Sequence, residues 1–228
     1  MKRIISFVLL AIVALGIILS LLYIPFGMPK TKVGEHYIKK GKQETGAANI
    51  VTAVVVNYRG FDTLGEVTVL FISAIGLSAV LATRGKKIAK KIEPASAILY
   101  TGCRFLFPLI LLFGAYIFIH GHLSPGGGFQ GGAIIASAFL LIYLGCRGRR
   151  ISEKRTKAVE SLSGLVIVVV GLIGLAVGGR YFLSNFLPKG ILFSLFSAGI
   201  IPIIYIAIGI KVGSELAFII DRLMEESE

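Results

Sequence analysis

Six apolar runs, each close to the length that spans a lipid bilayer, constrain this chain more than any other feature of its sequence. A helix rises about 1.5 Å per residue, so crossing the hydrocarbon core takes about 20 apolar residues. The runs cover residues 4–26, 63–83, 96–119, 129–146, 162–177 and 191–220. They predict an all-α integral membrane protein with about six transmembrane helices. The last run carries Pro202 in its interior, where we expect a kink.

The composition agrees with this prediction. The 228 residues are 55% hydrophobic and 16% charged, whereas soluble domains are about 45–50% apolar and about 25% charged. The chain has 24 Lys and Arg against 12 Asp and Glu, a net charge of +12, and its basic residues lie mostly between the apolar runs. This pattern indicates contact with a membrane surface and excludes a soluble enzyme, a disordered tail and a nucleic-acid domain.

Basic residues also predict how the spans are oriented. They are dense in the segments 84–93 and 147–157, and Lys/Arg-rich segments stay in the cytoplasm. With Lys2 and Arg3 also inside, six alternating spans give a multi-pass protein of the cell membrane with both termini cytoplasmic. This scheme places the segment 27–59 outside, although that segment is basic too. The first run is longer than a signal-peptide core, so we expect a retained anchor.

We expect two parts in the chain, residues 1–95 with two spans and residues 96–228 with four. A basic, proline-containing linker over residues 86–94 separates them. The two cysteines, Cys103 and Cys146, stand in or beside apolar runs without further ligands at metal-binding spacing, which predicts two inert buried thiols. No metal or cofactor is expected, and no catalytic motif supports an autonomous membrane enzyme.

Ionisable residues inside apolar runs are candidates for function, because each costs about 2.5–3.5 kcal/mol to insert in a membrane. Asp62, just before the second run, and Glu66, within it, are four residues apart, so they share one helix face. They could form a paired-carboxylate site for a proton or cation. The alternative is that Asp62 caps the start of a helix, with Glu66 one turn further along, where the helix dipole favours an anion. The two interpretations are compatible.

Three other charged residues lie within the runs. Arg104 lies about 13 Å into its span, so we expect a buried carboxylate or carbonyl partner, which another subunit could provide. Lys211 and Glu215 are spaced i,i+4 near the end of the last span, where we expect an interfacial pair whose lysine reaches toward water.

The most distinctive string runs from His120 to Gly132. Its candidate residues are His120, His122, Pro125, Gly126, Gly127, Gly128, Gly131 and Gly132. Proline and glycine permit a tight reversal, and the last two glycines let the next helix approach a neighbour closely. The two histidines lie at the membrane boundary, where they either relay protons or make interfacial hydrogen bonds. A metal site is not expected, because no third ligand is nearby.

Two strings of this sequence resemble the Mrp-type (Mnh) multisubunit Na⁺/H⁺ antiporters. Residues 49–66, ending in Arg-Gly-Phe-Asp-Thr-Leu-Gly-Glu, resemble the stretch near the C-terminus of the large A subunit. The segment from Arg104 through Pro108, Gly114 and Tyr116 to the glycine-rich string is similar to the B subunit. Their fusion in one chain resembles the arrangement in archaeal membrane-bound hydrogenase or sulfane reductase complexes.

The resemblance implies an accessory membrane subunit of a cation/proton-translocating assembly. The implied partners are other Mrp-like subunits, a hydrogenase- or complex-I-like redox module, membrane lipid, Na⁺ and H⁺. It assigns ion translocation to Asp62, Glu66, Arg104, His120 and His122. The alternative function is a purely structural assembly subunit that contacts no transported ion.

Overall fold

The computed structural model describes residues 2–23, 32–82, 95–146, 152–178 and 181–227, and its described secondary structure is entirely helical. The helices are α1 (Lys2–Tyr23), α2 (Lys32–Thr45), α3 (Ile50–Thr52), the π-helix η1 (Ala53–Tyr58), α4 (Gly60–Ala82), α5 (Ala97–Ile119), α6 (Gly128–Gly145), α7 (Glu153–Gly178) and α8 (Ile201–Ser227). The chain forms two compact units, Met1–His36 and Tyr37–Glu228. The first unit holds α1 and the start of α2, and the second holds all the other helices.

Within the described residues, five helices are long and apolar enough to cross a membrane. Their spanning stretches are Gly60–Leu81, Ala97–Ile119, Gly128–Gly145, Glu153–Gly178 and Ile201–Met224. The first expected span, residues 4–26, corresponds to α1, whose apolar stretch within the described residues is the shorter Phe7–Leu22. The prediction of an all-helical, multi-pass membrane protein is confirmed. The orientation of the termini stays a prediction.

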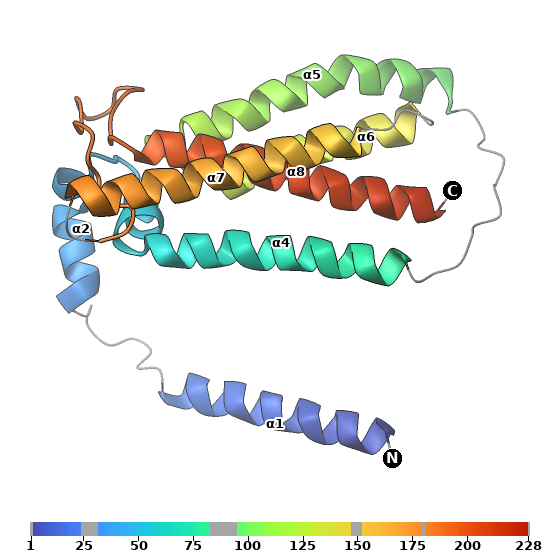
Figure 1. Ribbon diagram of the computed structural model, residues 1–228, viewed down its shortest axis with the longest axis horizontal. Coiled ribbons are helices and arrows are strands. Elements are labelled where there is room, and N and C mark those ends of the chain that lie inside the picture. The colour runs from blue at the N-terminus through green and yellow to red at the C-terminus, as the bar shows by residue number, and fades with distance from the viewer. Residues whose placement is uncertain (1, 24–31, 83–94, 147–151, 179–180, 228) are drawn as a thin grey trace. The chain divides into compact units, whose positions relative to one another are not determined.

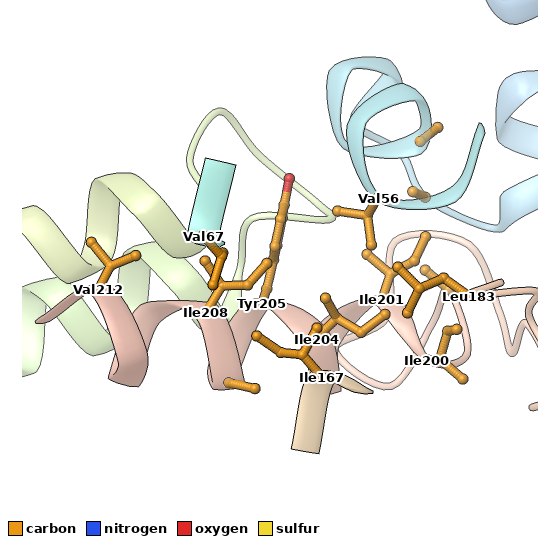
Figure 2. Packing of buried hydrophobic residues seen from close by; sticks show 14 residues of the cluster. Val56, Val67, Ile167, Leu183, Ile200, Ile201, Ile204, Tyr205, Ile208 and Val212 are labelled. Carbon is orange, nitrogen blue, oxygen red and sulfur yellow. The ribbon is translucent and has the colours of Figure 1, made fainter. Parts of the chain in front are cut away.

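Helix α8 is the centre of the second unit. It packs against α4, α5, α6 and α7, and 61% of its spanning stretch is buried, against 11% of that in α4 (Figure 1). Residues spaced three, four and seven apart share one helix face, and Ile201, Ile204, Tyr205, Ile208 and Val212 follow that spacing. Figure 2 shows the Tyr205 ring standing among these aliphatic side chains. The apolar core of the unit is therefore built along α8.

The structure corrects the expected sixth span and its kink. Residues 191–199 form turns and α8 begins only at Ile201, so the predicted span 191–220 was wrong in its first third. Pro202 lies in the first turn, where the backbone N–H that proline lacks would have no helical acceptor, so the predicted mid-helix kink is wrong as well. The side chain of Asn185 stabilises the turn, donating to the Ala198 carbonyl (3.2 Å) and accepting from the Ile200 N–H (3.2 Å).

Helices α4 to α8 alternate in direction, so their ends gather in two groups (Figure 1). Figure 1 shows α3, η1, the α5–α6 loop and residues 181–200 at one end. The C-terminal ends of α4, α6 and α8 and the first residues of α5 and α7 lie at the other. The basic segment 84–93 and the first part of 147–157 lie outside the described residues.

Cys103 of α5 and Cys146, which follows α6, are free thiols buried against each other. Their Sγ atoms are 3.5 Å apart, and the two residues are 1% and 5% exposed. The predicted burial is confirmed. Their inertness stays a prediction.

Candidate functional site

The two strings that stood out in the sequence meet in space at one end of the helices. Asn49 caps α3 and its Nδ2 donates to the carbonyls of Gly121 (3.0 Å) and Ser124 (2.9 Å). The Asn49 N–H donates to the carbonyl of His122 (3.1 Å). Thr52 Oγ1 donates to the carbonyl of Gly121 at 2.6 Å. The α5–α6 loop is thus tied to the start of α3 by hydrogen bonds between residues about seventy positions apart.

Tyr205 of α8 completes this junction. Its hydroxyl donates to Thr52 Oγ1 (2.9 Å), while its ring lies in the apolar core (Figure 2). A Cβ on Gly121 would lie 2.7 Å from that ring. Only a residue without a side chain fits there, so the loop backbone packs directly on α8.

The remaining glycines of the string also stand where helices approach closely. A Cβ on Gly128 would lie 2.6 Å from the Cβ of Ile208 in α8. A Cβ on Gly131 would lie 2.6 Å from the carbonyl of Gly114 in α5, and one on Gly132 would lie 2.9 Å from the carbonyl of Gly209. Helix α6 therefore packs backbone to backbone against a helix on each side.

The reversal before α6 depends on backbone conformations that glycine adopts easily. Gly126 and Gly127 have φ values of 153° and 155°, while Pro125 is exposed in the loop. The carbonyl of Gly127 accepts the first helical hydrogen bond, from the N–H of Gly131 at 3.0 Å. The turn thus ends directly in α6.

The two histidines of the loop have different surroundings. His120 is half-buried, stacks on Tyr116 with ring centroids 4.1 Å apart, and has Nδ1 3.0 Å from the Tyr116 carbonyl. His122 is fully buried, and neither of its ring nitrogens has a hydrogen-bond partner within the described residues. Burial lowers the pKa of His122, although the nearby backbone of Ser194 favours the protonated ring. The described residues contain no group of three or more His, Cys, Asp or Glu side chains that could hold a metal ion.

The carboxylates of the first motif lie on the surface of the chain. Asp62, in the first turn of α4, forms an ion pair with Arg59, and both side chains are more than half exposed. Glu66, one turn further along, is exposed, and its carboxylate has no ion pair or hydrogen bond within the described residues. The structure therefore pairs Asp62 with an arginine and leaves Glu66 at the outer face of a spanning helix.

Arg104 is also exposed on a spanning helix. Its Nη1 donates to the Tyr100 hydroxyl (3.1 Å), and its guanidinium lies 5.4 Å from the centre of that ring. The expected buried carboxylate or carbonyl is not found within the described part of this chain. The guanidinium of Arg104 therefore points away from the core of this chain, toward the lipid or the neighbouring subunit that borders α5.

The predicted Lys211–Glu215 pair is present, but the sequence did not predict that it is buried or that Glu160 of α7 joins it. Lys211 Nζ lies 3.1 Å from Glu215 Oε2 and 3.4 Å from Glu160 Oε1. The lysine was expected to reach toward water, and that prediction is wrong, because its side chain is only 8% exposed. Glu160 precedes the fifth predicted span, whereas α7 begins at Glu153 and carries it into the helix. Helical spacing could have indicated that Glu160 is buried, because it lies on one helix face with the other buried residues of α7. These residues are Thr156, Glu160, Ser163, Ile167, Gly171 and Gly174.

A polar cavity of about 420 Å³ lies beside η1 and was not predicted either. It is lined by Glu44, Asn57, Tyr58, Tyr181 and Lys189. Tyr58 donates its hydroxyl to Glu44, and burial together with this carboxylate raises the pKa of Tyr58. Asn57 accepts a hydrogen bond from the Tyr181 hydroxyl at 3.3 Å, so the cavity wall joins η1 to the segment before α8.

These features define a class: a helical, multi-pass membrane protein with ionisable side chains both at its surface and in its core. Residues 98–218 match the family model described as a domain related to the MnhB subunit of Na⁺/H⁺ antiporters. Residues 1–95 match the MbhE model, which describes the E subunit of MBH. The chain belongs to the MnhB-related family.

Two solved structures and one relative support this family assignment. A chain of the membrane-bound sulfane sulfur reductase, an archaeal respiratory membrane complex, is 49% identical, with a TM-score of 0.80 over 98% of each chain. A chain of the Mrp complex from Dietzia sp. DQ12-45-1b is 25% identical, with a TM-score of 0.73 over 97% of this chain and 26% of that one. The B subunit of the Na⁺/H⁺ antiporter of Alkalihalophilus pseudofirmus is 38% identical over 101 residues, which cover 42% of this chain and 69% of that protein. The resemblance to Mrp-type antiporters is confirmed.

Proposed function

We propose that this chain is an accessory membrane subunit of an Mrp-type cation/proton antiporter module within a respiratory membrane complex. The observation that carries the proposal is the match over 98% of both chains to a subunit of an archaeal respiratory membrane complex. The Mrp complex has a chain of the same fold, and the matched B subunit belongs to a Na⁺/H⁺ antiporter. Other Mrp-like subunits and a redox module are therefore its partners. The relatives are transport subunits, and we assign this chain no catalysis of its own and no cofactor.

The exposed charges of α4 and α5 support a place among other subunits. Glu66 and Arg104 both lie in spanning stretches and both face away from the chain's own core. A charged side chain facing lipid costs about 2.5–3.5 kcal/mol on insertion scales. Neighbouring subunits that cover these faces and offer polar partners remove that cost.

Within the module we assign the ion path to the exposed carboxylate of Glu66. Glu66, with Asp62 beside it, binds Na⁺ or exchanges protons at an interface with a neighbouring subunit, and Arg104 biases the local electrostatics. His120 and His122 lie at the end of the helices, where a proton enters or leaves. Residues 1–95 then act as the A-subunit-like part and residues 96–228 as the B-subunit-like part.

The test of the ion path is Glu66→Gln in the complex reconstituted in vesicles. We expect cation-coupled transport to fall at least about tenfold, because Gln keeps the size of the side chain and removes its charge. Recovery of the complex should be unchanged. The matched control is Glu153→Gln, which neutralises an exposed, salt-bridged glutamate at the start of α7.

Unchanged transport in Glu66→Gln would favour the alternative, a purely structural subunit. Purification of the chain in mild detergent, with identification of the proteins that accompany it, tests its membership in the complex. A chain recovered alone and active would overturn the whole proposal.

A further inference from the structure

A lysine and two glutamates are buried together deep in the membrane-spanning part of α7 and α8. Lys211 lies ten residues beyond Ile201, about 15 Å along a spanning stretch of 24 residues. Its ammonium group contacts Glu160 Oε1 at 3.4 Å and Glu215 Oε2 at 3.1 Å. The side chains of Lys211, Glu160 and Glu215 are 8%, 10% and 0% exposed. The lysine thus bridges two carboxylates away from water.

The charges of this cluster do not balance when all three groups are ionised. One ammonium and two carboxylates leave a net charge of −1, and burying an uncompensated charge costs several kcal/mol. The second oxygen of Glu215, Oε1, is buried without a hydrogen-bond partner in the described structure. One further positive charge at this place makes the cluster neutral.

A proton supplies that charge better than a metal ion does. Hard cations need several oxygen ligands, and the described residues contain no cluster of three acidic, His or Cys side chains. The ammonium of Lys211, which lies between the carboxylates, repels a second cation. A proton needs only one carboxylate oxygen, and on Glu215 it neutralises the most deeply buried carboxylate.

A cavity adjoins the cluster. A cavity of about 410 Å³ lies between α4, α7 and α8, and its polar lining comes from Ser78, Lys157, Glu160 and Ser161. Glu160 therefore contacts the lysine on one side and the cavity on the other.

The helices around the cluster add few other titratable groups. Phe71 of α4 places its ring 5.1 Å from Lys211 Nζ, and the titratable residue that α6 contributes is Tyr143. On α7, Lys157 lies at the cavity and pairs with Glu153 at the exposed end of the helix.

We propose that Lys211, Glu160 and Glu215 form a buried proton-binding site that holds one exchangeable proton and opens to the cavity beside α4. At rest Glu215 is a neutral acid, and Lys211 is paired with the Glu160 carboxylate. For exchange, Lys211 Nζ first gives a proton to Glu160 Oε1, and the resulting neutral amine then takes the proton of Glu215 Oε2. The products are a Glu215 carboxylate, an intact ammonium group and neutral Glu160, so net charge is unchanged. The use of this site in transport rests on the proposed function.

The test is infrared spectroscopy of the full-length chain purified with its accompanying subunits, because a protonated carboxyl has a C=O band that a carboxylate lacks. We expect this band at about pH 7, shifting in D₂O, and lowered by one carboxyl group in Glu215→Gln. We expect Glu160→Gln to lose the same carboxyl band, although Glu215 is still present. Without Glu160, the Lys211 ammonium and the Glu215 carboxylate form a neutral pair, so Glu215 no longer needs a proton. Glu153→Gln, the matched control on α7, should keep the full band.

An undiminished band in Glu160→Gln would overturn the proton site, and so would an undiminished band in Glu215→Gln. If Glu215→Gln is not recovered in the complex, Glu160→Gln alone decides. The band is read without any ion gradient, so a complex that transports nothing can still confirm the site. A complex that transports normally but lacks the band would overturn the site and leave the proposed function standing.

Discussion

Ionisable residues of this chain differ sharply in their surroundings, although the sequence presents them alike. Glu66 and Arg104 are exposed on spanning helices, whereas Lys211 and Glu215 are buried. All four interrupt apolar runs, and insertion cost alone makes each a candidate. The exposed residues need partners from outside the chain. The buried ones are paired within it.

His122 carries a prediction at the same scale. Burial holds its pKa below the ordinary value of 6.5, so between the two pKa values the unfolded chain binds more protons here than the folded chain. The stability that this residue contributes is therefore fully present above about pH 6.5 and is lost as the pH falls through the folded-state pKa. We expect the Tm of the purified chain to fall on acidification and this fall to be smaller in His122→Gln.

His120→Gln is the matched control, since His120 lies two residues away and is only half-buried. It should keep the pH dependence of the unmodified chain. An equal fall of Tm in His122→Gln and the unmodified chain would show that the buried ring does not titrate on unfolding.

At the scale of elements, glycine decides how closely the helices pack. Gly131→Ala brings a methyl group to 2.6 Å from the Gly114 carbonyl, so α5 and α6 must separate. We expect a loss of about 1–3 kcal/mol in the free energy of unfolding, the usual cost of overpacking. Thermal unfolding of the purified chain measures it.

Gly102→Ala provides the control for that substitution. Gly102 lies in the same helix as Gly114, and a Cβ there meets no atom within 4 Å. It should leave stability unchanged or raise it, because alanine favours a helix over glycine by up to about 1 kcal/mol. Equal effects of the two substitutions would exclude close packing as the reason for glycine at position 131.

At the scale of the whole molecule, the alternating directions of the helices determine which loops lie on the same side of the membrane. The segment before α8 and the α5–α6 loop lie at one end, and the start of α7 lies at the other (Figure 1). The basic-residue pattern places the second end in the cytoplasm. We expect a membrane-impermeant thiol reagent to label Phe196→Cys on intact cells and Lys154→Cys only after permeabilisation.

Both positions are exposed, and Cys103 and Cys146 are buried, so the native thiols should give little background. Labelling of Lys154→Cys alone on intact cells would reverse the predicted orientation. Labelling of both positions on intact cells would contradict the alternation of the spans.

The sequence by itself determined the fold class and the approximate positions of the spanning helices in the described part of the chain, because a bilayer requires about twenty apolar residues in a row. It also singled out the two strings that meet at the end of the helices, since their polar and glycine residues interrupt that pattern. It misplaced the start of α8, because the mostly apolar residues 191–199 continue the apolar run of that helix but form turns that the side chain of Asn185 stabilises.

Only the tertiary structure decided which charges are inside. Glu160 lies outside the predicted span 162–177 but inside α7, and Lys211 was expected at the interface but is covered by α7. Hydropathy along a chain records the cost of a charge in the membrane. Glu215, four residues from Lys211, is apparent as a partner in the sequence, whereas Glu160 lies 51 residues away on another helix and becomes apparent only when the helices pack.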